Sequence, residues 1–295
     1  MKNIAVIGAG TMGNGIAHVF IQHLFNVTLI DVQETQLEKA ITTIGKNFDK
    51  QINKGIVTEE QKNKSLENLF TSTNIAEGIK NADLIIEAAT ENTELKLKIF
   101  KQLDQHAPLH CILATNTSSI SITKIAAATQ RPQFVIGMHF MNPVPIMKLV
   151  EIINGYATSN EVTASIVALS KQLNKVPCVV NDYPGFIANR ILMPMINEAI
   201  LSLQEGVAGV EAIDTVMKLG MAHPMGPLQL ADFIGLDVCL NILNVLKEGY
   251  GNPKYAPSTL LVNMVTAGKL GVKSGEGFYT YTHNLKELIV SNAFK

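Results

Sequence analysis

The chain has 295 residues, of which 47% are hydrophobic and 17% are charged, and its formal net charge is −1 at pH 7. This length accommodates two domains or one large one, and the apolar composition is sufficient for large cores and a buried oligomer interface. A charge so close to zero argues against a general electrostatic grip on nucleic acid or on an anionic membrane. We therefore predict neither nucleic acid nor membrane as a partner.

Two further features indicate a cytoplasmic protein. The run from Asn3 to Gly8 already has the pattern of a core strand, so we expect no signal or transit peptide, and no apolar stretch approaches the roughly 18 residues of a membrane-spanning helix. The cysteines, Cys111, Cys178 and Cys239, are widely separated and match no metal-ligand spacing. We expect buried thiols in a reducing compartment, and no metal site.

Short apolar runs alternate with amphipathic segments over residues 1–180. Most of the runs are almost continuously hydrophobic, which is typical of parallel strands that helices cover on both faces. Alternation of strands and helices predicts an α/β fold with a doubly wound sheet of the Rossmann type. The predicted strands cover residues 4–7, 26–30, 83–87, 111–115, 134–138, 148–153 and 176–180.

A long helical segment lies between the second and third of these strands. Residues 34–70 have helical periodicity, Gly55 separates two arms, and Thr58-Glu-Glu-Gln61 is a capping box that begins the second arm. We predict a helical hairpin inserted into the α/β domain. A second capping box, over residues 158–161, is expected to begin the helix before the last strand.

The pattern changes after residues 182–186. From there to about residue 268 only helical periodicity is found, interrupted by Gly and Pro. We predict a Rossmann domain over residues 1–184 and an all-helical domain over residues 185–295, which binds substrate and forms a dimer. The residues after Tyr281 are expected to form an extra helix or a tail. The apolar residues expected at the dimer interface include Met193, Met195, Ile196, Leu201 and Leu203.

A glycine-rich turn follows the first predicted strand and begins a helix. Its sequence, Gly8-Ala-Gly10-Thr11-Met12-Gly13, fits G-x-G-x-x-G in the context where that pattern binds a dinucleotide. Gly8 permits the tight turn, Gly10 lets the backbone approach the pyrophosphate, and Gly13 lets helix and strand pack closely. The helix then presents free N–H groups and the positive end of its dipole to the phosphates. The alternative is a set of glycines that serves only a tight strand–helix turn.

An acidic residue supports the dinucleotide interpretation. Asp31 ends the second predicted strand, 21 residues after Gly10, at the separation expected for the carboxylate that binds the adenosine ribose. It would accept hydrogen bonds from the 2′- and 3′-hydroxyls and would repel a 2′-phosphate. The next residues, Val32 and Gln33, supply no cation for such a phosphate. The predicted cofactor is therefore NAD rather than NADP.

Seven further sequence motifs follow along the chain. They are Glu87-Ala-Ala-Thr-Glu-Asn92, Thr115-Asn-Thr-Ser-Ser119, Gly137-Met-His-Phe-Met-Asn-Pro143, Met147-Lys-Leu-Val-Glu151, Pro184-Gly-Phe-Ile-Ala-Asn-Arg190, His223-Pro-Met-Gly-Pro227 and Gly275-Glu-Gly-Phe-Tyr279. Together they resemble the L-3-hydroxyacyl-coenzyme A dehydrogenase family, most closely its stand-alone bacterial 3-hydroxybutyryl-coenzyme A dehydrogenases. The resemblance runs from Met1 to about Tyr281. It implies NAD-dependent interconversion of a 3-hydroxyacyl-CoA thioester, expected to be 3-hydroxybutyryl-CoA, with the 3-oxoacyl-CoA, and it implies a homodimer.

The resemblance also implies roles for individual residues. His139 is the implied catalytic base and Glu151 its partner, while Ser118 and Asn189 are implied ligands of the reacting oxygen. The residues implied to contact or lie beside the cofactor are Glu91, Lys96, Asn116, Ser118, Asn142 and Lys273.

The chemistry of these residue types supports the implied roles. A hydroxyl must lose its proton as hydride leaves for the nicotinamide, and histidine is the side chain best suited to act as a base near neutral pH. His139 follows the apolar run 134–138, so we expect it at the carboxyl edge of the sheet, where doubly wound sheets bind ligands. Glu151, in the adjacent predicted strand, would hold the other imidazole nitrogen. Ser118, in the turn after another strand, would donate to the developing carbonyl oxygen.

Three lysines suggest where coenzyme A binds. Lys46, Lys50 and Lys54 lie at i, i+4 and i+8 in the first arm of the inserted hairpin, and therefore on one helix face. This lysine ridge suits the 3′-phosphate or the pyrophosphate of coenzyme A, and we expect Lys50 and Lys54 to bind substrate. The alternative is an ordinary solvated basic face.

Two other functions fit parts of the pattern. One is a related hydroxy-acid dehydrogenase, such as a sugar-acid oxidoreductase of the crystallin-like branch, against which the basic hairpin and the match through the helical domain argue. The other is an NAD-binding protein without turnover, against which the joint presence of the four implied catalytic residues argues. The chain has Met141 where the family commonly has Phe, and Thr115 where Ser is common. Both departures bear at most on acyl-chain preference.

Overall fold

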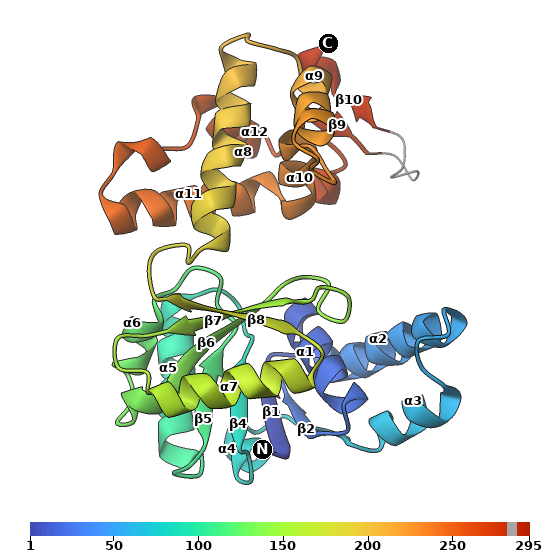
Figure 1. Cartoon of the computed structure of the whole chain (residues 1–295), viewed down its shortest axis with the longest axis vertical. Helices are drawn as coiled ribbons and strands as arrows, with labels where there is room; N and C mark the ends of the chain where they lie inside the picture. The colour runs from blue at the N-terminus through green and yellow to red at the C-terminus, as the bar shows by residue number, and fades with distance from the viewer. Residues whose placement is uncertain (282–287) are drawn as a thin grey trace. The chain divides into compact units, whose positions relative to one another are not determined.

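The computed structural model describes residues 1–281 and 288–295, which form two compact units, Met1–Tyr183 and Pro184–Lys295. Figure 1 shows the elements of each unit, coloured along the chain. The division lies one residue before the domain boundary that the sequence predicts. Each unit contains its own cluster of buried apolar side chains.

An eight-stranded sheet forms the centre of the first unit. Its strands lie in the order β3-β2-β1-β4-β5-β6-β7-β8. The chain passes from one half of the sheet to the other between β1 and β4, which is the switch point where doubly wound sheets bind ligands. The strands are β1 (Asn3–Ile7), β2 (Asn26–Ile30), β3 (Leu69–Ser72), β4 (Leu84–Glu87), β5 (Ile112–Thr115), β6 (Val135–Phe140), β7 (Leu149–Asn154) and β8 (Val176–Asn181).

Two features of the sheet differ from the sequence analysis. The strand β3 was assigned to the helical hairpin, because it has four residues and its Phe70 side chain is 54% exposed, which leaves a weak apolar signal. The sheet is also mixed rather than parallel, since β7 runs antiparallel to β6. Residues 141–148 connect these two strands, and so short a connection cannot return the chain for a parallel pairing.

Helices cover both faces of the sheet. On one face, α1 (Thr11–Gln22) packs on β1 and β2 while α7 (Asn160–Gln172) packs on β7 and β8. Their apolar side chains share one core cluster with those of α2. The connections on the other face are α4 (Ile75–Ile79), α5 (Thr93–His106) and α6 (Ile122–Ala126). The fold class predicted from strand–helix alternation is confirmed.

The inserted helical hairpin is also confirmed. It consists of α2 (Glu34–Asn53) and α3 (Glu59–Leu66), which extend away from the sheet in Figure 1. Thr58 and Gln61 form the predicted capping box, with each side chain accepting from the other's backbone N–H. The hairpin is attached to α1 by a stacked pair, His18 and Phe48, whose ring centroids are 4.2 Å apart.

The second predicted capping box is wrong. The helix α7 begins one residue later, with Ser159 as its N-cap accepting from the backbone N–H of Val162. The hydroxyl of Thr158 is used elsewhere, because it donates to the Val135 carbonyl at 2.6 Å and accepts from the Gly155 N–H at 2.9 Å. Thr158 therefore fixes the turn before the helix.

The second unit is helical, as predicted. Its helices are α8 (Ala188–Gln204), α9 (Val210–Thr215), α10 (Pro227–Ile234), α11 (Leu236–Tyr250) and α12 (Thr259–Thr266). Near its end, β9 (Tyr279–Thr280) pairs antiparallel with β10 (Ile289–Val290), an addition that the helical periodicity did not predict. A single 3-10 turn follows at Asn292–Phe294. The predicted tail helix would begin within residues 282–287, which lie outside the described residues.

No single helix in the described ranges is both long enough and apolar enough to cross a membrane. The helices α10 and α11, which meet at 97°, have the length and apolar composition of a membrane span only when they are taken together.

Candidate active site

The glycine-rich turn has the geometry that each glycine predicts. Gly8 follows β1 with φ of +96°, and a Cβ there would lie 2.8 Å from the Ala88 carbonyl oxygen. A Cβ on Gly13 would lie 1.7 Å from the Gly8 carbonyl oxygen, so only glycine fits where α1 packs on the turn. A Cβ on Gly10 would have no atom within 4 Å. The backbone at Gly10 therefore faces open space.

The start of α1 adds hydrogen-bond donors to this open space. Gly10 is the N-cap and supplies no side-chain cap. The first bond within the helix runs from the Asn14 N–H to the Gly10 carbonyl. The N–H groups of Thr11, Met12 and Gly13 precede it, and such groups have no acceptor within the helix. This arrangement fits a pyrophosphate group.

Asp31 holds the turn and faces the adjoining pocket. Its Oδ2 accepts from the Ala9 N–H at 2.8 Å, and its Oδ1 accepts from the Gln33 N–H at 3.0 Å. With Gly8 and Gly10, Asp31 lines a pocket of about 540 Å³ whose far wall is formed by the β4–α5 connection and α5. The position fits the ribose-binding role predicted for Asp31.

One residue in the wall of this pocket is not among the predicted site residues. Lys98 of α5 lines the same pocket as Asp31. Only Val32 and Gln33 follow Asp31 in the chain, whereas Lys98 reaches the pocket on α5, from a distant part of the sequence. An apolar face of α5, with Leu95 and Ile99, completes this wall.

His139 and Glu151 form a buried hydrogen-bonded pair. Their Nδ1 and Oε2 atoms are 2.8 Å apart, and the side chains are 11% and 3% exposed. The residues are direct register partners across the antiparallel strands β6 and β7. The carboxylate favours the tautomer with its proton on Nδ1, which makes Nε2 the nitrogen that accepts a proton. This is the base and orienting partner that general-base catalysis needs.

The position of His139 differs slightly from the prediction. The sequence placed it just after a strand ending at residue 138, whereas β6 continues to Phe140. Pairing with β7 extends the strand, and the Phe140 N–H donates to Asn116 Oδ1 at 2.9 Å. The backbone N–H of Asn116 donates to the Glu87 carbonyl. Asn116 therefore joins the ends of β4, β5 and β6.

Glu91 holds the turn that carries Ser118. Its Oε1 accepts from the N–H groups of Ser118 and Ser119, each at 3.0 Å, and from the hydroxyls of Thr117 at 2.6 Å and Ser119 at 2.9 Å. Burial alone would raise the pKa of Glu91, but the charge of Lys96 and these hydrogen bonds outweigh it and lower the pKa. An ionised carboxylate thus shapes the turn after β5.

A buried ion pair supports Glu91. Lys96 Nζ lies 2.6 Å from Glu87 Oε1, and both side chains are almost completely buried. Lys96 also donates to the Ala89 carbonyl and lies 3.5 Å from Glu91 Oε2, while the Thr115 hydroxyl donates to Glu87 Oε2 at 2.7 Å. The resemblance implied Lys96 as a cofactor contact. Its ammonium group is enclosed by these protein acceptors and lies beside Glu91, and the predicted cofactor contact stays a prediction. The sequence patterns indicate no role for Glu87.

The remaining predicted residues lie on other elements of the two units. Asn142 is exposed in the connection between β6 and β7. Asn189 lies in the first turn of α8 and Lys273 forms an ion pair with Asp237, so both belong to the second unit. Their roles toward the reacting groups stay predictions. The lysine ridge, Lys46, Lys50 and Lys54, is exposed at the end of α2.

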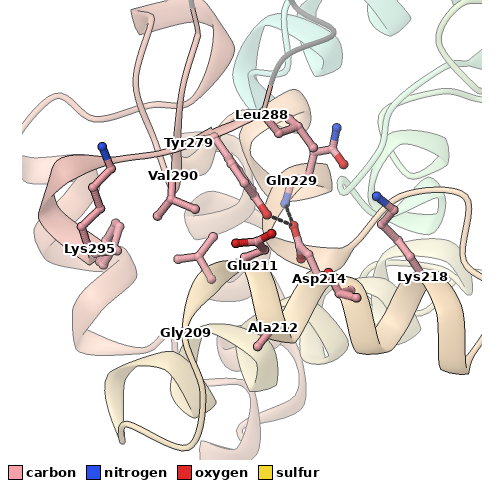
Figure 2. A pocket seen from close by; sticks show the side chains of 13 residues that line it. Gly209, Glu211, Ala212, Asp214, Lys218, Gln229, Tyr279, Leu288, Val290 and Lys295 are labelled. Carbon is pink, nitrogen blue, oxygen red and sulfur yellow. Dashed lines mark hydrogen bonds between the residues drawn. The ribbon is translucent and has the colours of Figure 1, made fainter.

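A larger hollow, of about 860 Å³, lies in the second unit. Figure 2 shows the Tyr279 hydroxyl and the backbone nitrogen of Gln229 directed at Asp214 in its wall. Asp214 accepts from the N–H groups of Leu228 and Gln229 and from the Tyr279 hydroxyl. It therefore caps α10 and attaches β9, although burial raises its pKa. The buried acid of this hollow has a structural role.

The cysteines differ in part from the prediction. Burial raises the pKa of Cys111 and of Cys239 to about 12, as expected for inert thiols. Cys178 was also expected to be buried, but it is exposed because β8 is an edge strand. Within residues 1–281 and 288–295, no group of three or more His, Cys, Asp or Glu side chains is placed to hold a metal ion.

Comparison with known proteins identifies the family. Residues 3–183 match the NAD-binding domain of 3-hydroxyacyl-CoA dehydrogenase, and residues 185–281 match the C-terminal domain of the same family. The chain belongs to the 3-hydroxyacyl-CoA dehydrogenase family. A probable 3-hydroxybutyryl-CoA dehydrogenase of Bacillus subtilis is 53% identical over 281 residues, which cover 95% of this chain and 98% of that protein.

More distant relatives and solved structures agree. The human mitochondrial hydroxyacyl-coenzyme A dehydrogenase is 43% identical over 287 residues, covering 95% of this chain and 91% of that protein. The crystal structure of (S)-3-hydroxybutyryl-CoA dehydrogenase from Ralstonia eutropha superposes with a TM-score of 0.93 at 48% identity, over 96% of this chain and 99% of that one. The predicted family and the NAD-binding Rossmann domain of this 3-hydroxyacyl-CoA dehydrogenase family member are confirmed.

Alanine substitutions at three glycines separate packing from cofactor binding. Gly13→Ala should destabilise the fold by about 1–3 kcal/mol or more, because its methyl group overlaps the Gly8 carbonyl. Gly10→Ala should fold normally but bind NADH about ten-fold more weakly or worse, because the methyl group occupies space needed by the pyrophosphate. The control is Gly45→Ala in α2, whose Cβ would also have no neighbour within 4 Å. Thermal unfolding and NADH fluorescence titration measure both effects, and Gly10→Ala protein that binds NADH as tightly as the control contradicts the cofactor assignment.

Substitution of Glu91 tests the support of the Ser118 turn. Glu91→Gln removes the charge shared by five donors of the turn, from Thr117, Ser118 and Ser119, and hydrogen bonds to a charged group contribute about 1.5–3 kcal/mol each. We expect the melting temperature to fall because these bonds weaken, and we expect kcat of the folded protein to fall by about ten-fold or more. Glu94→Gln, an exposed neighbour on α5, is the control. Unchanged steady-state kinetics in Glu91→Gln would show that the turn does not depend on this carboxylate.

Proposed function

We propose that this chain interconverts (S)-3-hydroxyacyl-CoA, chiefly 3-hydroxybutyryl-CoA, with the 3-oxoacyl-CoA by NAD-dependent hydride transfer. The observation that carries the proposal is the buried pair of His139 and Glu151 in the sheet of an NAD-binding domain. The names of the full-length relatives support the substrate class.

The cofactor fits the residues that are present. The open space at Gly10, the unpartnered first turn of α1 and the carboxylate of Asp31 fit a pyrophosphate and a ribose. NAD, when bound, supplies the hydride acceptor for the oxidation.

His139 moves the proton. In the oxidative direction its Nε2 accepts the proton of the substrate hydroxyl, and in the reductive direction it returns that proton to the carbonyl oxygen. Glu151, at 2.8 Å from Nδ1, stabilises the imidazolium and keeps the ring oriented. The low exposure of Glu151 keeps bulk water from competing for this hydrogen bond.

Two donors are proposed for the reacting oxygen. The Ser118 hydroxyl, which donates to Glu91 Oε1 at 3.3 Å, would turn from Glu91 to the reacting oxygen, and the Asn189 amide comes from α8 of the second unit. Preorganised donors of this kind stabilise charge that develops on the oxygen. Asn142 and Lys273 remain candidates for direct cofactor contacts, whereas Asn116 acts through the strand ends that it joins.

The lysine ridge is proposed to bind the coenzyme A phosphates. Lys46, Lys50 and Lys54 are exposed; Lys46 and Lys50 lie in the last turns of α2, and Lys54 is its C-cap residue. The nearby Lys62 pairs with Asp49 and Glu59, so its charge is already compensated.

A homodimer is proposed through the second unit. The apolar residues that the sequence analysis expected at an interface include Met193 and Ile196, which instead lie in the unit's own core. The exposed apolar surface lies nearby, at Val216 and Leu219, whose side chains are 60% and 81% exposed. It adjoins an apolar groove lined by Met195, Ala199, Val207, Ala208, Ile213 and Met217. An apolar surface of this kind is typical of an interface.

The central test is NADH oxidation with three candidate substrates. We expect turnover with acetoacetyl-CoA, and neither with free acetoacetate nor with a sugar acid. His139→Gln should lower kcat by roughly 100- to 10,000-fold, while the Kd of NADH stays nearly unchanged because the side chain is outside the glycine-rich turn. Activity on the free acids alone would replace the proposed function with the sugar-acid alternative, and NADH binding without any turnover would support a non-catalytic role.

Substrate truncation tests the lysine ridge. Lys50→Ala combined with Lys54→Ala should raise KM for acetoacetyl-CoA about ten-fold, because each lost phosphate contact removes roughly 0.5–1 kcal/mol or more. KM for the N-acetylcysteamine thioester, which lacks these phosphates, should not change. Lys101→Ala on α5 is the control. Equal increases of KM for both thioesters would show that the lysine ridge does not bind the coenzyme A phosphates.

Light scattering tests the dimer surface. Val216→Asp combined with Leu219→Asp places two charges on the apolar surface and should yield monomers, because burying unpaired charges is costly. Leu109→Asp, at an 84% exposed leucine of the first unit, is the control and should leave the mass unchanged. A doubly substituted protein with the wild-type mass would place the interface elsewhere.

A further inference from the structure

Lys175 is a buried lysine that the reaction described above does not use. It lies between α7 and β8 and is only 7% exposed. Its burial lowers its pKa. In the described part of the chain, no carboxylate forms an ion pair with it within 4 Å. A buried ammonium group costs free energy unless its donors are used, so its acceptors indicate what it does.

The ammonium group of Lys175 binds two backbone carbonyls of the loop between β6 and β7. Its Nζ donates to the carbonyls of Val144 and Met147, at 2.5 and 2.7 Å. The same loop is tightened from inside, because the N–H groups of Ile146 and Met147 both donate to the Pro143 carbonyl. Without Lys175, the carbonyls of Val144 and Met147 would lose this donor, and the first of these bonds is buried.

This loop is the connection between the strands of the proposed base and its partner. It covers residues 141–148, with His139 two residues before it and Glu151 three residues after it. It also carries Asn142. Any shift of the loop therefore moves a predicted cofactor contact and the pairing of β6 with β7.

The loop is anchored from two sides. Val144 is 2% exposed and packs on α1, where a Cβ on Gly15 would lie 2.9 Å from the Val144 Cβ. On the other side, the Val176 N–H donates to the Lys148 carbonyl where β8 joins β7. Lys175 fixes the segment between these two anchors.

His18 of α1 is the titratable group that faces Lys175. Burial, with a smaller contribution from the Lys175 charge, lowers the pKa of His18 to about 4. His18 is therefore neutral near pH 7, and its Nε2 lies 3.3 Å from Gln51 Oε1. The neutral His18 therefore does not repel the buried ammonium group of Lys175.

We propose that Lys175 is a positioning residue for hydride transfer, because it holds the loop that joins His139 to Glu151 through the carbonyls of Val144 and Met147. The proposal rests on the proposed function for its kinetic consequences. Its structural consequence, the geometry of the His139–Glu151 hydrogen bond, can be measured without turnover.

Two substitutions separate the charge from the hydrogen bonds. Lys175→Met keeps a long side chain without donors, and Lys175→Gln keeps N–H donors without charge. Lys171→Met, at an exposed lysine of α7, is the matched control. For each protein, the measurements are the melting temperature, the number of NADH-binding sites, kcat and KM with acetoacetyl-CoA, and the downfield proton resonance of the His139 Nδ1–H, assigned by its loss in His139→Gln.

We expect Lys175→Met to lower kcat per NADH-binding site by about ten-fold or more, since small misplacements of catalytic groups have effects of this size. KM for the thioester should stay nearly unchanged, and the His139 resonance should shift or broaden. Lys175→Gln should fall between Lys175→Met and the wild type, and Lys171→Met should match the wild type.

Wild-type kcat per binding site and an unchanged His139 resonance in Lys175→Met overturn the proposal. A purely structural role predicts a lower melting temperature with both of these readouts unchanged, and it overturns the proposal equally. Should Lys175→Met fail to fold, Lys175→Gln carries the same comparison. If even the wild type does not turn over the thioester, the proposed function fails, while the resonance still tests the positioning by Lys175.

Discussion

The antiparallel pairing of β6 with β7 is the constraint on which the candidate site depends. His139 is the fifth residue of β6 and Glu151 the third residue of β7, and the register places them directly opposite each other. In a parallel pairing the start of β7 would lie at the far edge of the sheet, away from His139. The short connection between the strands excludes the parallel arrangement. The reversed direction of β7, to which β8 runs parallel, thus creates the buried pair of base and carboxylate in a Rossmann sheet.

Buried charged side chains hold the segments around this pair in place. Glu87, at the end of β4, and Lys96, in the first turn of α5, form an almost completely buried ion pair, and through Glu91 this pair fixes the turn of Ser118. Lys175 does the same for the loop between the two catalytic strands. Breaking the pair of Glu87 and Lys96 would leave an uncompensated buried charge, and removing Lys175 would leave the carbonyls of Val144 and Met147 without this donor. Preorganisation of this kind is what a hydride transfer with proton abstraction requires.

The parts of the fold with strong local signals could be predicted from the sequence. The strands β1 and β2, the glycine-rich turn and the capping box at Thr58 each depend on neighbouring residues, and they lie where the pattern placed them. The strand β3, the N-cap at Ser159 and the exposure of Cys178 depend on partners from distant segments, and these predictions failed or were missing. The pairing of His139 with Glu151 was inferred from residue chemistry and family resemblance. The roles of Glu87 and Lys175 could not be inferred, because a buried charge is recognised only when its burial and its acceptors are known.

Pre-steady-state and steady-state reduction of acetoacetyl-CoA by Glu151→Gln, at saturating NADH, tests the pairing most directly. The substitution keeps the shape of the side chain but removes the charge that stabilises the imidazolium at 2.8 Å. We expect kcat to fall by about 100-fold, which corresponds to roughly 2.7 kcal/mol of lost transition-state stabilisation, with an unchanged Kd for NADH. A Glu151→Gln protein that turns over at the wild-type rate would contradict the assignment of His139 and Glu151 as a functional pair.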